Sequence, residues 1–317
     1  MLTFRSASLD DAPFVADVVT ARRGDEPADP KKLAHWWRSA DPEWTNDRWL
    51  VERRTTPIGY AYQTHPPWAK LPERYSRLGC ELLPADHVAA HLGEGYDFVE
   101  RRAAEDGALK LSAYAREDDG FTDAFLRQRG YSEDRRSKGW ELDLVANRER
   151  LTAMTEASRA RMRSEGISLL TVDRDRDPEK LHRIYEMSEE AAEDVPRTIP
   201  HIRQPFAIFM HWFESPALRL DRMWIAREAD DIVGVSVLAY PPIRGNVWTD
   251  WTGTARRVRG RGVARALKLE TVIQAIALGV TRVRTENDGA NAPILHLNAD
   301  MGYVRIPGWI QHLRDAS

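Results

Sequence analysis

Apolar residues fall into short runs and helical spacings that follow one another in the same order in both halves of the chain. A run at 2–5 precedes Asp10 and Asp11, and a run at 168–172 precedes Asp175 and Asp177. Each arrangement indicates a strand followed by a helix, because acidic side chains favour the positive start of a helix. In the second half the periodicity predicts strands at 168–172, 223–228, 232–240, 246–254, 281–286 and 304–313, and helices at 178–192, 205–215, 262–278 and 291–301.

Glycine and aromatic landmarks also recur in the same order in the two halves. Corresponding landmarks are separated by similar numbers of positions, which favours duplication of one folding unit over chance. The pairs are Gly59 with Gly234, Tyr131 with Tyr303, and Trp140 with Trp309. We therefore expect an α/β (α+β) protein that contains two related units of strands and helices.

A charged segment with a thin apolar stripe separates the two halves. Residues 147–165 place Leu151, Met154 and Met162 among many charges, and Gly166 follows as a helix stop. This segment predicts a linker helix. The expected organisation is a first domain at 1–146, the linker helix at 147–165 and a second domain at 166–317.

The composition limits the classes of function that we expect. The 317 residues include 46 Lys and Arg against 49 Asp and Glu, and a net charge of −3 gives no global attraction to nucleic acid or anionic membranes. Cys80 is the single cysteine, which excludes an internal disulfide and a cysteine zinc cluster. The chain shows neither a signal-peptide pattern nor a long apolar run, so we expect a cytoplasmic protein without a metal.

The segment at 247–264 carries the clearest chemical signal. An alternating stretch leads into Arg256-Arg257-Val258-Arg259-Gly260-Arg261-Gly262-Val263-Ala264, and a helical pattern follows. Glycines let a ligand approach the backbone, and the free N–H groups and positive dipole of a helix start attract anions. The pattern predicts a pyrophosphate cradle, although neither a Walker A loop nor a dinucleotide fingerprint is present. A basic turn that binds nothing, or that binds nucleic acid, is the alternative.

Two motifs in the second half together resemble the GNAT (Gcn5-related N-acetyltransferase) superfamily. The stretch at 259–264 is similar to the Arg/Gln-x-x-Gly-x-Gly/Ala signature that binds the pyrophosphate of acetyl-CoA in that family. Thr285-Glu286-Asn287, Asn291 and the stretch at 297–303 resemble the family's strand, Asn-started helix and Gly-aromatic close. The resemblance implies two tandem GNAT folds, each a mixed, mostly antiparallel twisted sheet flanked by helices. The first half lacks the arginine and paired glycines, so we expect no acetyl-CoA there.

The resemblance further implies that acetyl-CoA is the co-substrate and assigns its contacts. The turn would hold the pyrophosphate, the preceding strand would pair with the pantetheine arm, and two asparagines would bond the arm from the other side. That strand is expected to separate from the next and to leave a slot for the thioester. The implied cofactor residues are Thr252, Gly253, Thr254, Arg259, Gly260, Arg261, Gly262, Val263, Ala264, Asn287 and Asn291.

Asp250 and Asn298 are the main candidates for the catalytic chemistry, and Glu286 is a weaker candidate base. Strand alternation places positions 248, 250, 252 and 254 on one face, so Asp250 is a candidate base, and an acid that only orients the substrate is an equal alternative. The family often has a tyrosine as general acid on its last helix, and Asn298 stands at that position here. Asparagine cannot act as an acid, but it can hydrogen-bond the sulfur.

Acidic and aromatic residues in the second half are candidates for the acceptor side. Glu193 and Asp194 end an acidic run that would favour a cationic acceptor, and a solvated helix face is the alternative. Trp212 belongs to an aromatic stretch that either walls an acceptor pocket or packs in the core.

We therefore expect an acyltransferase, namely an acetyl-CoA-dependent N-acetyltransferase that acts on a small, cationic amine by direct attack on the thioester. Mycothiol synthase-type acetylation of a cysteinyl amine and non-catalytic acyl-CoA binding are the alternatives. The expected partner is a small-molecule amine, without nucleic acid or membrane, and the protein is expected to be a monomer or homodimer.

Overall fold

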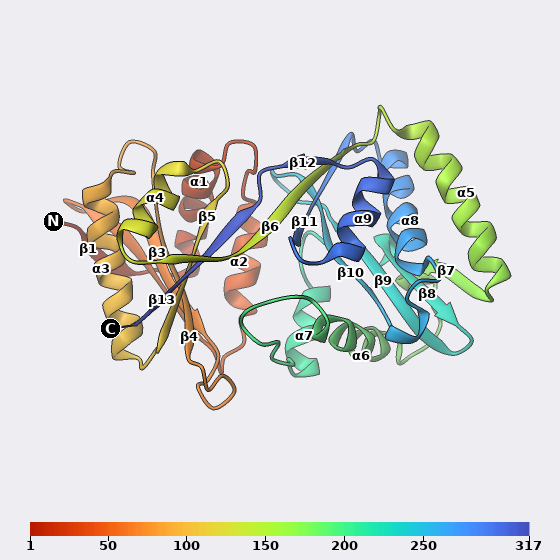
Figure 1. Ribbon diagram of the computed structural model, residues 1–317, viewed down its shortest axis with the longest axis horizontal. Coiled ribbons are helices and arrows are strands. Elements are labelled where there is room, and N and C mark those ends of the chain that lie inside the picture. Colours follow the sequence, from red (N-terminus) through yellow and green to blue (C-terminus); the bar gives the residue numbers. More distant parts are fainter. Residues whose placement is uncertain (317) are drawn as a thin grey trace.

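The computed structural model describes residues 1–316 and shows the two halves side by side along its longest axis (Figure 1). The elements of the first half are β1 (Thr3–Ser6), α1 (Ala12–Arg22), α2 (Pro30–Arg38), β2 (Thr45–Arg53), β3 (Thr56–His65), β4 (Tyr75–Leu82), α3 (Ala89–Glu105), β5 (Lys110–Arg116), α4 (Gly120–Gln128) and β6 (Ser132–Asp143). Helix α5 (Arg148–Ser164) follows, within the segment expected to be a linker helix.

The second half repeats this order of strands and helices and ends in one additional strand. Its elements are β7 (Ile167–Thr171), α6 (Lys180–Glu193), α7 (Phe206–Phe213), β8 (Met223–Glu228), β9 (Asp231–Ala239), β10 (Val247–Thr254), α8 (Val263–Ala277), β11 (Arg282–Asp288), α9 (Ala292–Met301), β12 (Val304–Ile306) and β13 (Trp309–Asp315). Among the described residues, no helix combines the length and the apolar character that crossing a membrane requires.

Strand pairing joins both halves into one long sheet. The strand order is β1-β2-β3-β4-β5-β13-β6-β11-β10-β9-β8-β7, and β12 pairs with β6 away from this path. The pairs β4–β5 and β10–β11 are parallel, and the other pairs are antiparallel. The mixed, mostly antiparallel α/β class predicted from the sequence is confirmed.

The two halves exchange strands where they meet. Strand β13, the last of the chain, leaves the second half and pairs with β5 and with the start of β6 in the first half. The other end of β6 pairs with β11 and β12 of the second half. In each half, the sheet is therefore completed by a strand from the opposite half. The domain division at 147–165 stays a prediction, and this pairing crosses it.

The single strand predicted at 304–313 is wrong, because Pro307 and Gly308 divide it. Before this break, β12 pairs with β6, and after it, β13 crosses to the first half. The backbone is packed so closely here that a Cβ on Gly308 would lie 2.3 Å from the carbonyl oxygen of Ser137. The apolar pattern of both pieces fits one strand, so the pattern alone does not reveal the crossing.

Helices cover both faces of the part of the sheet that lies in the second half. Gly234 of β9 lies so close under α8 that an added Cβ would be 2.8 Å from Leu267. Gly253 pairs with Val235, the next residue of β9, and so faces the other side, where an added Cβ would meet Ala191 of α6 at 3.1 Å. One face of the sheet therefore lies under α8, and the opposite face lies under α6 and α7.

We expect Gly139→Ala to destabilise both halves together by about 1–3 kcal/mol, because overpacking at a backbone contact forces strands apart. A Cβ on Gly139 would lie 2.4 Å from the carbonyl oxygen of Pro307, between β6 and β12. Gly93→Ala in α3 is the matched control, since its Cβ would meet nothing within 4 Å. That change should stabilise the protein by about 0.5–1 kcal/mol. Chemical denaturation measures the unfolding free energy of each variant. Equal values would contradict the close packing of β6 against the backbone at Pro307.

Candidate active site

A gap opens in the second sheet between β10 and β11. The two parallel strands pair only through Val247 with Val283 and Trp248 with Arg284. Beyond these residues β10 keeps its pairs with β9, and β11 keeps its pairs with β6. The two strands therefore separate at the place where the sequence resemblance implied a slot.

The turn between β10 and α8 leaves a helix start open to an anion. Gly260 and Gly262 have left-handed φ angles of 77° and 88°, which a residue with a side chain rarely adopts. Gly262 is the N-cap residue of the 15-residue helix α8, and no side chain of the described residues caps it. The N–H groups of Val263 and Ala264 therefore keep their bonding capacity for a ligand, as an anion-binding helix start requires.

Carboxylates already pair with the arginines of this turn. Asp194 accepts hydrogen bonds from Arg256 Nε at 2.7 Å and from Arg259 Nη1 at 2.6 Å, and Glu193 accepts one from Arg256 Nη2 at 2.8 Å. These bonds, the one from Arg256 first, lower the pKa of Asp194 to about 2. The structure thus places Glu193 and Asp194 against the turn, where a bound pyrophosphate would compete with them.

Three other residues that the sequence assigned to the cofactor differ in which of their polar groups are free to bind a ligand. Arg261 is paired with Glu165 at the end of α5, with a distance of 2.9 Å from Nε to Oε2. Thr252 Oγ1 lies 2.8 Å from Ser236 Oγ, so the backbone of Thr252 is the part left for a ligand. Asn291 is the N-cap residue of α9, but its side chain makes no capping hydrogen bond and stays available.

A β-bulge in β10 changes the faces that alternation predicted. Thr249 pairs with Leu238 of β9, yet Trp251, two residues later, pairs with the adjacent Val237. Asp250 is therefore the extra residue of the bulge, and the alternation is reversed beyond it. The prediction that positions 248, 250, 252 and 254 share one face is wrong for this reason.

Asp250 is held between the two halves of the molecule. Its Oδ2 accepts a hydrogen bond from Trp212 Nε1 of α7 at 2.7 Å. Its Oδ1 lies 3.4 Å from Lys32 Nζ, which comes from α2 of the first half. The structure thus brings together Asp250 and Trp212, two of the residues predicted from the sequence, and adds a cation from the other half.

Contacts across the interface hold α2 in this place. Asp29 caps α2 and also accepts hydrogen bonds from the backbone N–H groups of Ile243 at 2.6 Å and Arg244 at 3.0 Å. His35 Nε2 lies 2.9 Å from the carbonyl oxygen of His211 in α7. The first half therefore forms one wall of the site beside Asp250.

Glu286 lies on the other side of the gap. The last pair between β10 and β11 joins Trp248 to Arg284. Asp250 lies two residues beyond it on β10, and Glu286 lies two residues beyond it on β11, so the two carboxylates stand on opposite strands of the opening. Glu286 is an exposed residue, yet partial desolvation of its carboxylate raises its pKa. A raised pKa makes a carboxylate a stronger base, which favours a role in proton transfer.

Asn298 is completely buried on the α8 side of the sheet. Its Nδ2 donates to Asn287 Oδ1 at 2.7 Å, and its Oδ1 accepts from Lys268 Nζ at 2.9 Å. Burial lowers the pKa of Lys268 to about 7, and its ammonium lies 4.9 Å from the ring centre of Tyr303. A titratable lysine is thus linked to Asn287 by two hydrogen bonds through Asn298, the residue that stands where the sequence resemblance implied a tyrosine.

Sequence reasoning missed Lys32 and Lys268. Lys268 stands four residues after Ala264 and four before Val272, within the apolar side of α8, and a lysine in that stripe was an available signal. Lys32 lies 218 positions from Asp250, and no local pattern connects them.

The fold, with a gap between parallel strands in its second half, is similar to that of a solved tandem GNAT protein. A tandem GNAT protein from the clavulanic acid biosynthesis pathway, solved without AcCoA, matches with a TM-score of 0.76 and 16% identity over 100% of this chain and 99% of its own. A GCN5-related N-acetyltransferase from Sphaerobacter thermophilus has a TM-score of 0.66 and 20% identity over 99% of this chain and 96% of its own.

An acetyltransferase of the GNAT family from Colwellia psychrerythraea gives a TM-score of 0.62 at 13% identity over 99% of both chains. The likeness at these identities establishes the fold. No protein-family model and no curated protein matches the sequence. Activity must therefore be argued from the site itself.

Proposed function

We propose that the protein is an acetyl-CoA-dependent N-acetyltransferase that acts on a small amine. One observation carries the proposal: an uncapped helix start with a Gly-Arg-Gly turn and a carboxylate in a β-bulge flank the same gap in the sheet. The helix start suits a pyrophosphate, and the gap suits the arm that links it to a thioester. Asp250 then stands beside the end of the arm.

The chemistry needs a group that accepts a proton from the attacking amine. Bound acetyl-CoA would supply the acetyl group as a thioester; as the C–N bond forms, the C–S bond breaks and CoA leaves as a thiolate, which takes a proton from water. Asp250 accepts the amine proton, while Trp212 and Lys32 fix the orientation of its two oxygens. Asn298 fixes the side chain of Asn287 by a hydrogen bond, and the turn at 259–264, the backbone of 252–254, Asn287 and Asn291 bind the cofactor.

The acceptor that fits best carries a positive charge. Asp250 and Glu286 flank the gap; Lys32 already pairs with Asp250, whereas Glu286 has no ion pair among the described residues and is the carboxylate that an approaching ammonium group meets. This support replaces Glu193 and Asp194, whose carboxylates are bonded to arginines of the turn. Among residues 1–316 no contact singles out a cysteinyl amine, so a mycothiol synthase-type acceptor is one member of the class to be tested.

Acetyl-CoA binding is the first measurement. We expect Arg259→Glu to weaken binding about tenfold to hundredfold, because a charge-assisted bond to phosphate is replaced by repulsion. Asp194→Asn, which releases Arg259, should bind acetyl-CoA at least as tightly as the parent protein. Arg219→Glu, an exposed arginine paired with Asp221, is the control. Isothermal titration that shows equal affinities for all four proteins would place the cofactor elsewhere.

Turnover is the second measurement. A panel of small amines is incubated with acetyl-CoA, and release of free CoA thiol is followed. Diamines and amino sugars should give turnover, and their fully N-acetylated forms, which have no free amine, should give none. Tight acetyl-CoA binding without turnover on any amine would favour a non-catalytic acyl-CoA-binding protein, for which the absent family tyrosine is the supporting observation.

A further inference from the structure

A buried lysine of the second half stands where an apolar side chain would be expected. Lys268 of α8 is 1% exposed, and it forms no ion pair with a carboxylate of the described residues. An ammonium group buried in this way costs stability, which an apolar side chain of similar length would avoid. Among the described residues its Nζ has one hydrogen-bond acceptor, Asn298 Oδ1 at 2.9 Å. A function for this lysine therefore acts through Asn298.

The bond from Lys268 determines which way round two amide groups lie. Because an ammonium group only donates hydrogen bonds, Asn298 turns its oxygen toward Lys268 and its Nδ2 away. That Nδ2 donates to Asn287 Oδ1 at 2.7 Å, so the oxygen of Asn287 is occupied and its own Nδ2 remains as a donor. We refer to Lys268, Asn298 and Asn287 as the amide link. Without the lysine, both amides are free to turn over, and Asn287 then presents an oxygen in place of an N–H.

The remaining donor of Asn287 lies on the strand that borders the gap. Asn287 follows Arg284, the last residue of β11 that pairs with β10, and on the other side it pairs with Lys138 of β6. Its Nδ2 donates to no group of the described residues, yet it is not among the buried polar atoms that lack a partner, so it keeps surface that a ligand can reach. The arm of an acyl-CoA carries carbonyl oxygens, the acceptors that an amide N–H requires.

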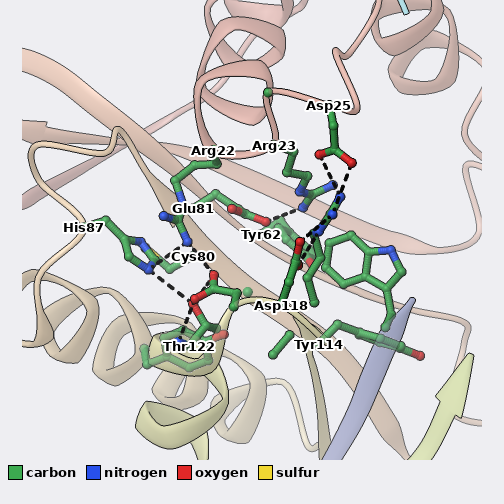
Figure 2. Close-up of a pocket in the computed structure, with 17 residues that line it drawn as sticks. Arg22, Arg23, Asp25, Tyr62, Cys80, Glu81, His87, Tyr114, Asp118 and Thr122 are labelled. Carbon is green, nitrogen blue, oxygen red and sulfur yellow. Dashed lines mark hydrogen bonds and ion pairs between the residues drawn. The ribbon is translucent and has the colours of Figure 1, made fainter. Parts of the chain in front are cut away.

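The first half provides an internal comparison. Its strands β4 and β5 also separate beyond the pairing of residues 75–77 with 110–112, and a cavity of about 290 Å³ lies there (Figure 2). The charged groups that line this cavity are bonded to one another, as Arg22 Nη2 is to Asp119 Oδ2 at 2.6 Å. The two left-handed glycines that precede α8 have no counterpart before the helix that follows β4. The first half is therefore a duplicate of the fold without the cofactor turn.

The three positions of the amide link have aromatic or apolar counterparts in this duplicate. The separation in sequence that relates Tyr131 to Tyr303 also relates Tyr96 to Lys268, Leu126 to Asn298 and Ala115 to Asn287.

The structure supports this alignment at the helices. The backbone N–H of Tyr131 donates to the carbonyl oxygen of Leu126 at 3.1 Å, as that of Tyr303 does to Asn298 at 3.1 Å. The ring of Tyr96 packs edge-on against Tyr131, where Lys268 lies over the ring of Tyr303. Among the described residues, the amide link thus occurs in the half that has the cofactor turn and is replaced in the half that lacks it.

We propose that Lys268 is a positioning residue for the acyl-CoA arm: through Asn298 it fixes Asn287 as a hydrogen-bond donor to a carbonyl oxygen of the arm. This role rests on the proposed function and adds to it a residue that does not touch the ligand. Because the lysine acts through two amide groups, its effect is confined to ligands that contain the arm.

Isothermal titration with two ligands tests the proposal. One is acetyl-CoA, and the other is the ADP portion of CoA with its ribose phosphate, which lacks the arm. Lys268→Met should weaken binding of acetyl-CoA about threefold to tenfold, as loss of one hydrogen bond predicts, and leave the armless nucleotide unaffected. Gln274→Met, which removes the acceptor for Trp224 from the same helix, is the control and should bind both ligands like the parent protein. Equal acetyl-CoA affinity of the parent and Lys268→Met would overturn the proposal.

Asn298→Asp separates the polarity of the amide link from its packing. The two side chains have the same shape, but a carboxylate accepts from Lys268 and from Asn287, so Asn287 turns its oxygen toward the ligand. We expect binding of acetyl-CoA to weaken about tenfold and binding of the armless nucleotide, which carries the same phosphates, to stay unchanged. The affinity of the parent protein in this variant, which a role in packing alone predicts, would contradict the proposal. If circular dichroism shows that Lys268→Met is unfolded, this variant decides.

Asn287→Ala tests whether the lysine acts through Asn287. In the Asn287→Ala protein, the additional change Lys268→Met should cause no further loss of acetyl-CoA affinity, because the donor that it positions is already absent. A further loss as large as in the parent protein would overturn the proposal. Failure of the parent protein to bind acetyl-CoA would contradict the proposed function itself, whereas binding by the parent with unchanged affinity in the variants overturns the role of Lys268 alone.

Discussion

Replacing Asp250 by asparagine is expected to lower kcat for amine acetylation by about 10²–10⁴-fold and to leave the affinity for acetyl-CoA unchanged. Asparagine keeps the size of the side chain and still accepts the bond from Trp212, but it cannot take up the proton of the attacking amine. The cofactor contacts lie on the turn and along the backbone of β10, so they are not affected. A loss of this size is the largest effect on activity that the site predicts.

The pH profile distinguishes a base from an orienting acid. A base gives kcat/KM an acid limb, which the asparagine variant should lose, whereas an orienting acid changes KM and keeps the limb. Glu286→Gln is the informative partner, because Glu286 stands across the gap and has a raised pKa. If the limb survives in Asp250→Asn and disappears in Glu286→Gln, Glu286 is the base. Asp221→Asn, an exposed acid, controls for a general effect of charge.

Features that depend on neighbouring residues were predictable from the sequence. The strands at 223–228 and 231–239 and the helix at 263–277 lie within one or two residues of the expected bounds, because apolar periodicity and flanking glycines determine them. The open helix start is predictable for the same reason, since the two glycines and the arginines belong to one short segment.

Features that depend on distant parts of the chain were not predictable. A bulge inserts one residue without altering the alternating pattern of β10, so the side on which Asp250 lies is decided by the register with β9. The crossing of β13 likewise leaves no trace in its apolar pattern. The acidic end of α6 pairs with the arginines of the turn, where charge alone fits an ammonium acceptor equally well.

The structure also identifies one residue whose cost to stability depends on pH. Lys268 is buried without a carboxylate partner among the described residues, and burial lowers its pKa from the ordinary 10.5 to about 7. In the unfolded chain the same group keeps its proton up to higher pH. Between these two values the unfolded state binds the extra proton, so the unfolding free energy rises with pH.

Lys268→Met removes this dependence. The difference in unfolding free energy between the parent protein and the variant should shift by about 2–3 kcal/mol between pH 6 and pH 9, in favour of the parent at the higher pH. Methionine leaves Asn298 Oδ1 without its donor, a cost of about 1–3 kcal/mol that is the same at both pH values and cancels from the shift.

Denaturant titrations of both proteins at the two pH values measure this shift, and changes in other titrating groups cancel because they are common to both. Lys31→Met in α2, an exposed position, should give a difference that does not vary with pH. A pH-independent difference for Lys268→Met would show that its ammonium stays hydrated in the folded state. The lysine would then carry a full charge beside Asn298 at neutral pH, and it could not give up a proton near the gap.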